Sequence, residues 1–143
     1  MVPEKVLVFL FEPFRNASSE LGKFFVFTVV ELEPVTAIQI SETSSRWELP
    51  AAGCIDGNTN RLGCHTAAYR YPWFAIDYGT TVNVERVEIF NRGDCCGSNA
   101  KNVDVRVTDE LPTSGSQRFS GGNLLGHFAG PGTTGQHLIV SGQ

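Results

Sequence analysis

The sequence predicts an all-β protein, an antiparallel β-sandwich, on three observations. The 143-residue chain contains 15 Gly and 7 Pro, which suits many short strands joined by tight turns. Its length fits one domain with a hydrophobic core of its own. From about Glu31 onward, short runs of β-favouring residues alternate with clusters of Gly, Pro, Asn and Ser, and this regular spacing is typical of a sandwich.

Six runs in this part of the chain are predicted strands because they are rich in branched and aromatic residues. They span residues 35–40, 73–78, 82–91, 103–108, 124–128 and 137–140. Apolar and polar residues alternate from Val103 to Val107, so one face of this strand is expected to be buried and the other solvated. A change of register near Glu85 and Arg86 predicts a bulge or turn.

Residues 1–30 are set apart from residues 31–143 because they are strongly apolar and carry little turn chemistry. The start of this segment resembles a signal peptide, but residues 12–15 do not form a small-residue cleavage site. The alternative is an extra strand: residues 24–31 have strand character and are expected to add to an open sheet, within the chain or from a neighbour. The division predicts an N-terminal apolar segment followed by the main domain.

Composition excludes several classes of function. The net charge is -4 and no stripe of Lys and Arg is present, so nucleic acid is not an expected partner. No apolar run reaches the roughly 18 residues that span a bilayer, so no membrane insertion is expected. His65, His127 and His137 lack a nearby nucleophile or metal-binding partner, and the sequence therefore predicts no enzyme.

The four cysteines point to disulfides because none of them forms a CxxC metal or redox motif. Disulfides favour an oxidising compartment, so a secreted, extracellular protein is expected. Cys95 and Cys96 are adjacent. They can form a vicinal disulfide with an unusual peptide geometry, pair separately with Cys54 or Cys64, or stay reduced.

One motif surrounds this cysteine pair. Twenty-six residues separate His65 from Arg92, Asp94 follows two residues later, and Cys95 and Cys96 come next. In this pattern the sequence resembles the F-type lectin (fucolectin) family. Two further blocks, Ile55-Asp56-Gly57-Asn58-Thr59 and Pro72-Trp73-Phe74-Ala75-Ile76-Asp77, also match, and the resemblance covers about residues 31–140.

The resemblance implies a jelly-roll sandwich that binds L-fucose or fucosylated glycans, and a role in innate recognition. By position, His65 would bond the axial hydroxyl and Arg92 a neighbouring oxygen. Asp94 would orient these cations through charge-assisted hydrogen bonds, and Cys95 with Cys96 would pack against the ring carbons. A sugar offers both hydroxyls and an apolar face, so this set of groups suits it. Taken without the motif, His65 would be a histidine satisfied by a backbone carbonyl.

The sequence departs from the family at the second basic position, which Asn99 occupies. A short neutral amide cannot replace a guanidinium fork, and the expected loss of fucose affinity is about 1.5–3 kcal/mol. Lys101 would either reach in instead or remain a solvated surface lysine. Two alternatives follow: a diverged lectin-fold module that no longer binds fucose, and an adhesion module using the Arg92-Gly93-Asp94 tripeptide.

A structural Ca²⁺ site is also implied by the resemblance, with Gly53, Asp56 and Asn58 as ligands. Oxygen ligands of this kind suit Ca²⁺, although a plain turn at the same residues is the alternative. The sandwich is expected to lack the family's last strand and its cysteine. Cys64 would then need another partner, and a bridge to Cys54, ten residues away, would close the Asp56 loop. A homo-oligomer would raise the avidity of a weak site.

Overall fold

The computed structural model describes residues 4–10, 24–29, 36–39, 54–55, 64–65, 71, 73–82, 84, 86–91, 93, 97–113 and 118–141. The elements in chain order are β1 (Glu4–Leu10), β2 (Phe24–Val29), β3 (Thr36–Gln39), β4 (Cys64–His65), β5 (Trp73–Val82), β6 (Arg86–Asn91), the 3-10 helix η2 (Gly97–Asn99), β7 (Val103–Thr108), β8 (Asn123–Phe128) and β9 (His137–Ser141). Among these residues there is no helix long and apolar enough to cross a membrane.

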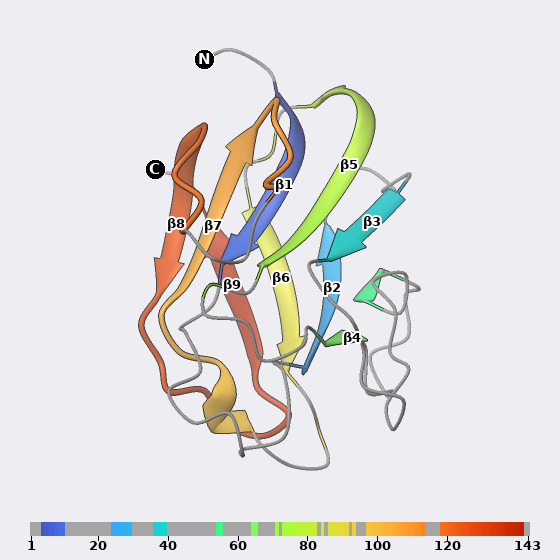
Figure 1. The fold of residues 1–143 in the computed structure, drawn as a ribbon. Coiled ribbons are helices and arrows are strands. Elements are labelled where there is room, and N and C mark those ends of the chain that lie inside the picture. The colour runs from blue at the N-terminus through green and yellow to red at the C-terminus, as the bar shows by residue number, and fades with distance from the viewer. Residues whose placement is uncertain are drawn as a thin grey trace.

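The strands form two sheets that pack face to face (Figure 1). One sheet has the order β3-β5-β1-β7-β8 and the other β4-β2-β6-β9. Every pair of neighbouring strands in both sheets is antiparallel. The predicted all-β fold, an antiparallel sandwich, is therefore confirmed.

The main core lies between the sheets and is built from alternate strand residues. The five-stranded sheet contributes Leu7, Phe9, Phe74, Ile76, Tyr78, Val103 and Val105, and the four-stranded sheet contributes Val87, Ile89, Leu138 and Val140. The Phe9 and Phe74 rings lie 5.6 Å apart, centroid to centroid, in a tilted arrangement, which is a favourable geometry for two aromatic rings. The alternation predicted for 103–108 is thus the pattern by which β7 reaches this core.

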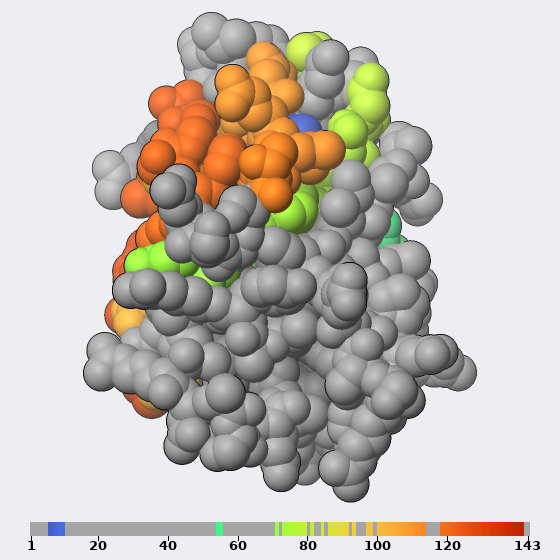
Figure 2. All heavy atoms as spheres, in the orientation of Figure 1, coloured from blue at the N-terminus to red at the C-terminus, as the bar shows by residue number. Residues whose placement is uncertain are grey.

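Strand β1 and the first part of β5, residues 73–76, do not show the alternation predicted for β7, and little of β1 is visible in the space-filling view (Figure 2). A second buried cluster covers the outer face of the five-stranded sheet and consists of Val6, Val8, Leu10, Trp73 and Ala75, with Phe119 packed against it. Strand β1 is therefore buried on both faces, which explains why residues 6–10 form a continuous apolar run. In β9, by contrast, Leu138 and Val140 are buried while their neighbours are exposed.

Residues 1–30 contribute a strand to each sheet. Strand β1 is paired with β5 on one side and β7 on the other, and β2 lies between β4 and β6. The strand character of residues 24–31 is thus realised as β2, inside a sheet. Burial of Leu7, Val8 and Phe9 at 0% exposure makes the same residues a central part of the hydrophobic core.

The strand predicted over residues 82–91 divides in two. Strand β5 extends to Val82 and β6 begins at Arg86, so the break falls where the register change predicted a bulge or turn. Gly79 interrupts the regular geometry of β5 with a φ of 71°, which glycine adopts without steric cost. Its amide donates a hydrogen bond of 2.8 Å to the carboxylate of Asp77.

Replacement of Phe9 by alanine tests the place of β1 in the core. Phe9 is 0% exposed, so Phe9→Ala is expected to lower the free energy of unfolding by about 3–5 kcal/mol through lost burial and a residual cavity. Chemical denaturation measures this change. Ile139, 59% exposed, provides the control, because Ile139→Ala is expected to change stability by only about 0.5 kcal/mol. Equal stability of the two variants would contradict a buried β1.

Candidate functional site

Strand pairing brings His65 to the same end of the sheet as the end of β6. Within β2, Phe24 is paired with His65 and Phe25 with Cys64, while Phe25 is also paired with Asn91 on its other side. Cys64 and Asn91 therefore lie in one row across the sheet, about 10 Å apart at the usual strand spacing. Strands β4 and β6 run in the same direction, since both are antiparallel to β2.

The next residue after Asn91 in the sequence is Arg92. His65 stands one residue beyond Cys64, and Arg92 stands one residue beyond Asn91, so the two occupy corresponding places in the chain relative to this row. The twenty-six residues between them in the sequence thus connect two strands that finish at the same end of the four-stranded sheet. This end of the sheet lies towards the bottom of the molecule in Figure 1, where η2 is also found.

Only part of the predicted site is described by the structure. For His65 and Asn99 the backbone is described, in β4 and at the end of η2 respectively. Outside the described residues lie Arg92, Asp94, Cys95 and Cys96 of the predicted sugar site, and Gly53, Asp56 and Asn58 of the predicted calcium site. Lys101, the alternative cation, is exposed and next to the strand β7 that begins at Val103.

Cys54 lies within the segment that carries the predicted calcium ligands, between Gly53 and Asp56. It is 0% exposed and disulfide-bonded, and Ile55 beside it packs against the main core. Cys54 and Ile55 therefore fix this part of the segment to the sandwich. The partner sulfur lies outside the described side chains, and the Cys54–Cys64 pairing stays a prediction.

Asn91, the last residue of β6 and the one before Arg92, has a role that the sequence did not indicate. It is 6% exposed, and its side-chain Nδ2 donates hydrogen bonds to the carbonyl oxygens of Gly97 at 2.9 Å and Thr133 at 3.0 Å. Its backbone amide donates to the carbonyl of Gln136 at 2.9 Å. Asn91 thereby connects the end of β6 to η2 and to the segment that leads into β9.

Gly97 packs directly against this second segment. Its amide donates to Thr134 Oγ1 at 3.3 Å, and a Cβ atom added to Gly97 would lie 2.1 Å from the Thr134 nitrogen and 2.3 Å from the Thr133 carbonyl carbon. Both are backbone atoms, so no side chain could be accommodated without moving the main chain. Glycine is thus required here by the close approach of two backbone segments.

The connection from β8 to β9, residues 129–136, is itself held by backbone hydrogen bonds. Asn102 donates to Ala129 at 3.0 Å and Gly132 donates to Ala100 at 2.8 Å. Within the segment, Gln136 donates to the carbonyl of Thr133 at 3.1 Å, and the Thr133 amide donates to the Gln136 side-chain oxygen at 2.8 Å. These bonds fix the surface against which Asn91 and Gly97 pack.

A family model described as a NedA-like, galactose-binding domain matches residues 53–127, just over half of the chain. The chain belongs to this family. The matched region includes β4 with His65, the end of β6 and η2, but neither β2 nor residues 129–136.

Three curated relatives match parts of the chain. Fucolectin from Anguilla anguilla is 30% identical over 70 residues, 46% of this chain and 44% of that protein. Fucolectin-6 from Anguilla japonica is 34% identical over 68 residues, 43% of this chain and 37% of that protein. A pentraxin fusion protein from Xenopus laevis is 33% identical over 52 residues, 36% of this chain and 12% of that protein.

The chain spans less than half the length of each of these relatives. Two of the three are named fucolectin, so the resemblance that the sequence predicted is confirmed. No solved structure is significantly similar to the chain.

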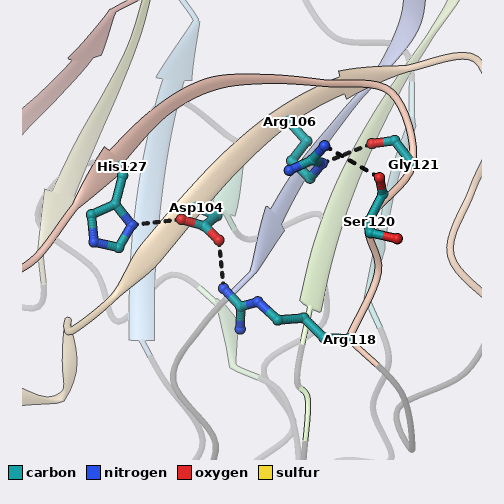
Figure 3. A network of polar contacts seen from close by, with 6 residues as sticks. All are labelled: Asp104, Arg106, Arg118, Ser120, Gly121 and His127. Atoms are coloured by element: carbon teal, nitrogen blue, oxygen red, sulfur yellow. Dashed lines mark hydrogen bonds and ion pairs between the residues drawn. The ribbon is translucent and has the colours of Figure 1, made fainter.

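A separate polar network lies on the outer face of the five-stranded sheet (Figure 3). Asp104 on β7 accepts a hydrogen bond of 2.6 Å from Arg118 Nη2 and lies 2.5 Å from His127 Nδ1 on β8. Two residues further along β7, Arg106 Nε donates to the carbonyl of Gly121 at 2.7 Å. These contacts hold the segment around Phe119, which covers the outer apolar cluster.

The two histidines whose side chains are described are both paired with carboxylates. His127 contacts Asp104, and His137 Nε2 lies 2.8 Å from Glu88 Oε1. The His137 ring also stacks on Phe90, with the centroids 4.3 Å apart and the planes 12° from parallel. Each of these contacts joins neighbouring strands of one sheet, so both imidazoles have a role in strand packing.

The Asp104 network predicts a specific acid sensitivity. Burial of this carboxyl acts to raise its pKa, but the hydrogen bonds and charges of Arg118 and His127 together hold the pKa of Asp104 below its usual value. Stability from this group is therefore fully present above the pKa of about 3.9 expected in the unfolded chain, and it is lost as pH falls through the lower folded pKa.

Asp104→Asn is accordingly expected to be less stable than the wild type at pH 7, by roughly 0.5–1 kcal/mol because the pair is partly exposed. The difference should shrink as the pH falls from 4 towards 2. Urea unfolding across this pH range measures it. Glu110→Gln, at an exposed carboxylate outside this network, is the control and should show no such trend. A difference independent of pH would contradict the proposed ion-pair contribution.

Proposed function

We propose that the chain is a carbohydrate-binding lectin domain whose sugar site lies at the end of the sandwich where β4 and β6 meet β2. The observation that carries this proposal is the shared row of Cys64, Phe25 and Asn91. This row brings His65 and Asn91, the residue before Arg92, to the same end of the sheet. The family's description as galactose-binding and the names of two fucolectin relatives support a sugar as ligand.

L-fucose or a fucosylated glycan is the ligand that the motif favours. We assign the axial hydroxyl to His65 and a neighbouring oxygen to Arg92, with Asp94 orienting both cations by charge-assisted hydrogen bonds. Cys95 and Cys96, as a bonded pair, would supply an apolar surface for the ring carbons. A fixed array of donors beside one apolar surface is the usual composition of a small-ligand site.

Asn99 sets the expected strength of this site. It ends η2 and replaces the second basic residue of the fucolectin motif, so one charged contact to the sugar is missing. The site is therefore expected to be weak for a single sugar unit, and oligomerisation would raise its avidity. The alternative function is a diverged lectin-fold recognition or adhesion module that no longer binds fucose.

Binding without chemical conversion is the role we propose for this site. The proposed sugar ligands include one imidazole, one guanidinium and one carboxylate, and Asp94 is already used to orient the cations. A glycosidase would need two carboxyl groups flanking the scissile bond, about 5–10 Å apart. The sequence at the proposed site offers one.

A structural Ca²⁺ is proposed for residues 53–58. The side chains of Asp56 and Asn58 and the carbonyl of Gly53 offer the hard oxygen ligands that Ca²⁺ prefers, and the buried, disulfide-bonded Cys54 anchors this segment to the core. A bound ion would hold the loop that leads towards His65 and so preorganise the sugar site.

An extracellular location and a role in innate recognition complete the proposal. The even number of cysteines and the disulfide at Cys54 favour an oxidising compartment. Fucosylated surface glycans are accessible partners in that compartment.

Isothermal titration calorimetry with L-fucose and D-galactose tests the sugar site. The wild type is expected to bind L-fucose in preference to galactose, and Arg92→Ala and His65→Ala are each expected to weaken binding by at least about tenfold, because each removes a hydrogen bond that includes or depends on a charged group.

Matched substitutions away from the site provide the controls. Arg86, exposed at the opposite end of β6, is the control for Arg92, and His127 on the other sheet is the control for His65. Arg86→Ala and His127→Ala should retain the wild-type Kd. Wild-type protein that binds neither sugar would favour the diverged module. Equal losses of affinity in the control variants would exclude a local site at this end of the sheet.

Thermal unfolding with and without Ca²⁺ tests the metal proposal. Addition of Ca²⁺ to chelator-treated protein is expected to raise the Tm in a concentration-dependent manner, because a ligand bound only by the folded state stabilises it. Asp56→Ala should abolish this increase, whereas Asp109→Ala, an exposed carboxylate beyond the end of β7, should preserve it. An unchanged wild-type Tm at millimolar Ca²⁺ would leave residues 56–58 as a plain turn.

A further inference from the structure

One buried side chain joins the two described residues, Asn91 and Gly97, on either side of the interval 92–96, which carries most of the proposed sugar-site residues. Asn91 is the last residue of β6 and Gly97 is the first of η2, so the five residues 92–96 lie between them in the sequence. The Asn91 Nδ2 group donates to the Gly97 carbonyl across this interval at 2.9 Å. The side chain that precedes the loop therefore bonds to the residue at which the loop ends.

The same amide reaches a third part of the chain. Asn91 Nδ2 also donates to Thr133, 42 residues away in the sequence, and Gly97 is in contact with Thr133 and Thr134. Both ends of the loop are thus joined to residues 129–136, which are themselves tied to Ala100 and Asn102 by backbone bonds.

We propose that Asn91 is a positioning residue of the sugar site: its buried amide closes the Arg92–Cys96 interval onto Gly97 and fixes it against Thr133. This inference rests on the proposed lectin function, because Arg92, Asp94, Cys95 and Cys96, four of the residues assigned to the sugar site, lie in this interval. Asn91 is neither one of the fucolectin motif residues nor one of the proposed calcium ligands. In this proposal it does not touch the sugar and acts through residues 92–96.

The chemistry of the amide makes this role specific. Both partners of Nδ2 are carbonyl oxygens, which only accept hydrogen bonds, so the side chain must supply two donors. An aspartate of the same shape would place one carboxylate oxygen where Nδ2 stands, facing both carbonyls, and would leave them without a donor. A loop released from these bonds must be ordered again when sugar binds, and that cost appears as lost affinity.

Thr108 provides a matched comparison at the other end of the molecule. Asn91 and Thr108 are the two buried polar residues among those described, at 6% and 2% exposure. Thr108 ends β7, whose opposite end follows η2 and Ala100, and its Oγ1 accepts a hydrogen bond of 3.1 Å from the Glu110 amide. Thr108→Val keeps the shape of the side chain and removes that bond, far from the loop.

The experiment compares Asn91→Asp, Asn91→Ala and Thr108→Val by thermal unfolding and by calorimetric titration with L-fucose. All three variants are expected to unfold at a lower Tm than the wild type. Only the two Asn91 variants are expected to bind L-fucose more weakly, by about tenfold, on the order of the loss of two hydrogen bonds. Gly97→Ala, whose Cβ would displace the Thr133–Thr134 backbone, should weaken binding similarly with Asn91 intact.

Amide hydrogen exchange of residues 92–97 supplies a readout that needs no ligand. Exchange in this interval should accelerate in Asn91→Asp and stay at the wild-type rate in Thr108→Val, because local opening follows the loss of local bonds. Wild-type affinity in the Asn91 variants, or an equal loss in Thr108→Val, would overturn the inference. If the wild type binds no sugar, the lectin proposal fails, and unchanged exchange in Asn91→Asp would still separately overturn the positioning role.

Discussion

Burial of β1 on both faces is the constraint on which the rest of the structure depends. Leu7 and Phe9 face the main core, whereas Val6, Val8 and Leu10 face the outer cluster. Because β1 is paired with β5 and β7, the five-stranded sheet is held together through its central strand. The outer cluster must in turn be covered, and the polar contacts of Arg106 and Asp104 secure the segment that contributes to this cover.

The alternating strands could be predicted from the sequence, and β1 could not. Strand β7 matches the predicted range, and β9 differs by one residue, because each has one solvated face and so shows a period of two. The run from Val6 to Leu10 has no such period, since both of its faces are buried, and an apolar run of this length resembles the core of a signal peptide as much as a buried strand.

The candidate site divides in the same way. The spacing of His65 and Arg92 can be read from the sequence. The pairing of β4, β2 and β6 shows that the strands preceding these two positions finish at the same end of the sheet. The role of Asn91 could not be predicted, because its partner Thr133 is 42 residues away. An asparagine at a strand end has no sequence signal that separates a buried bridge from an exposed turn.

The two sets of contacts support the proposed site at different levels. The hydrophobic core fixes the sheets and hence the row that contains Cys64 and Asn91, but a strand end alone does not determine the path of the loop that follows it. In the proposed positioning role, the bonds from Asn91 to Gly97 and Thr133 supply that second constraint, since one buried amide donates to two carbonyls. A sugar site needs both levels, because weak individual hydrogen bonds produce useful affinity only when their donors are already in place.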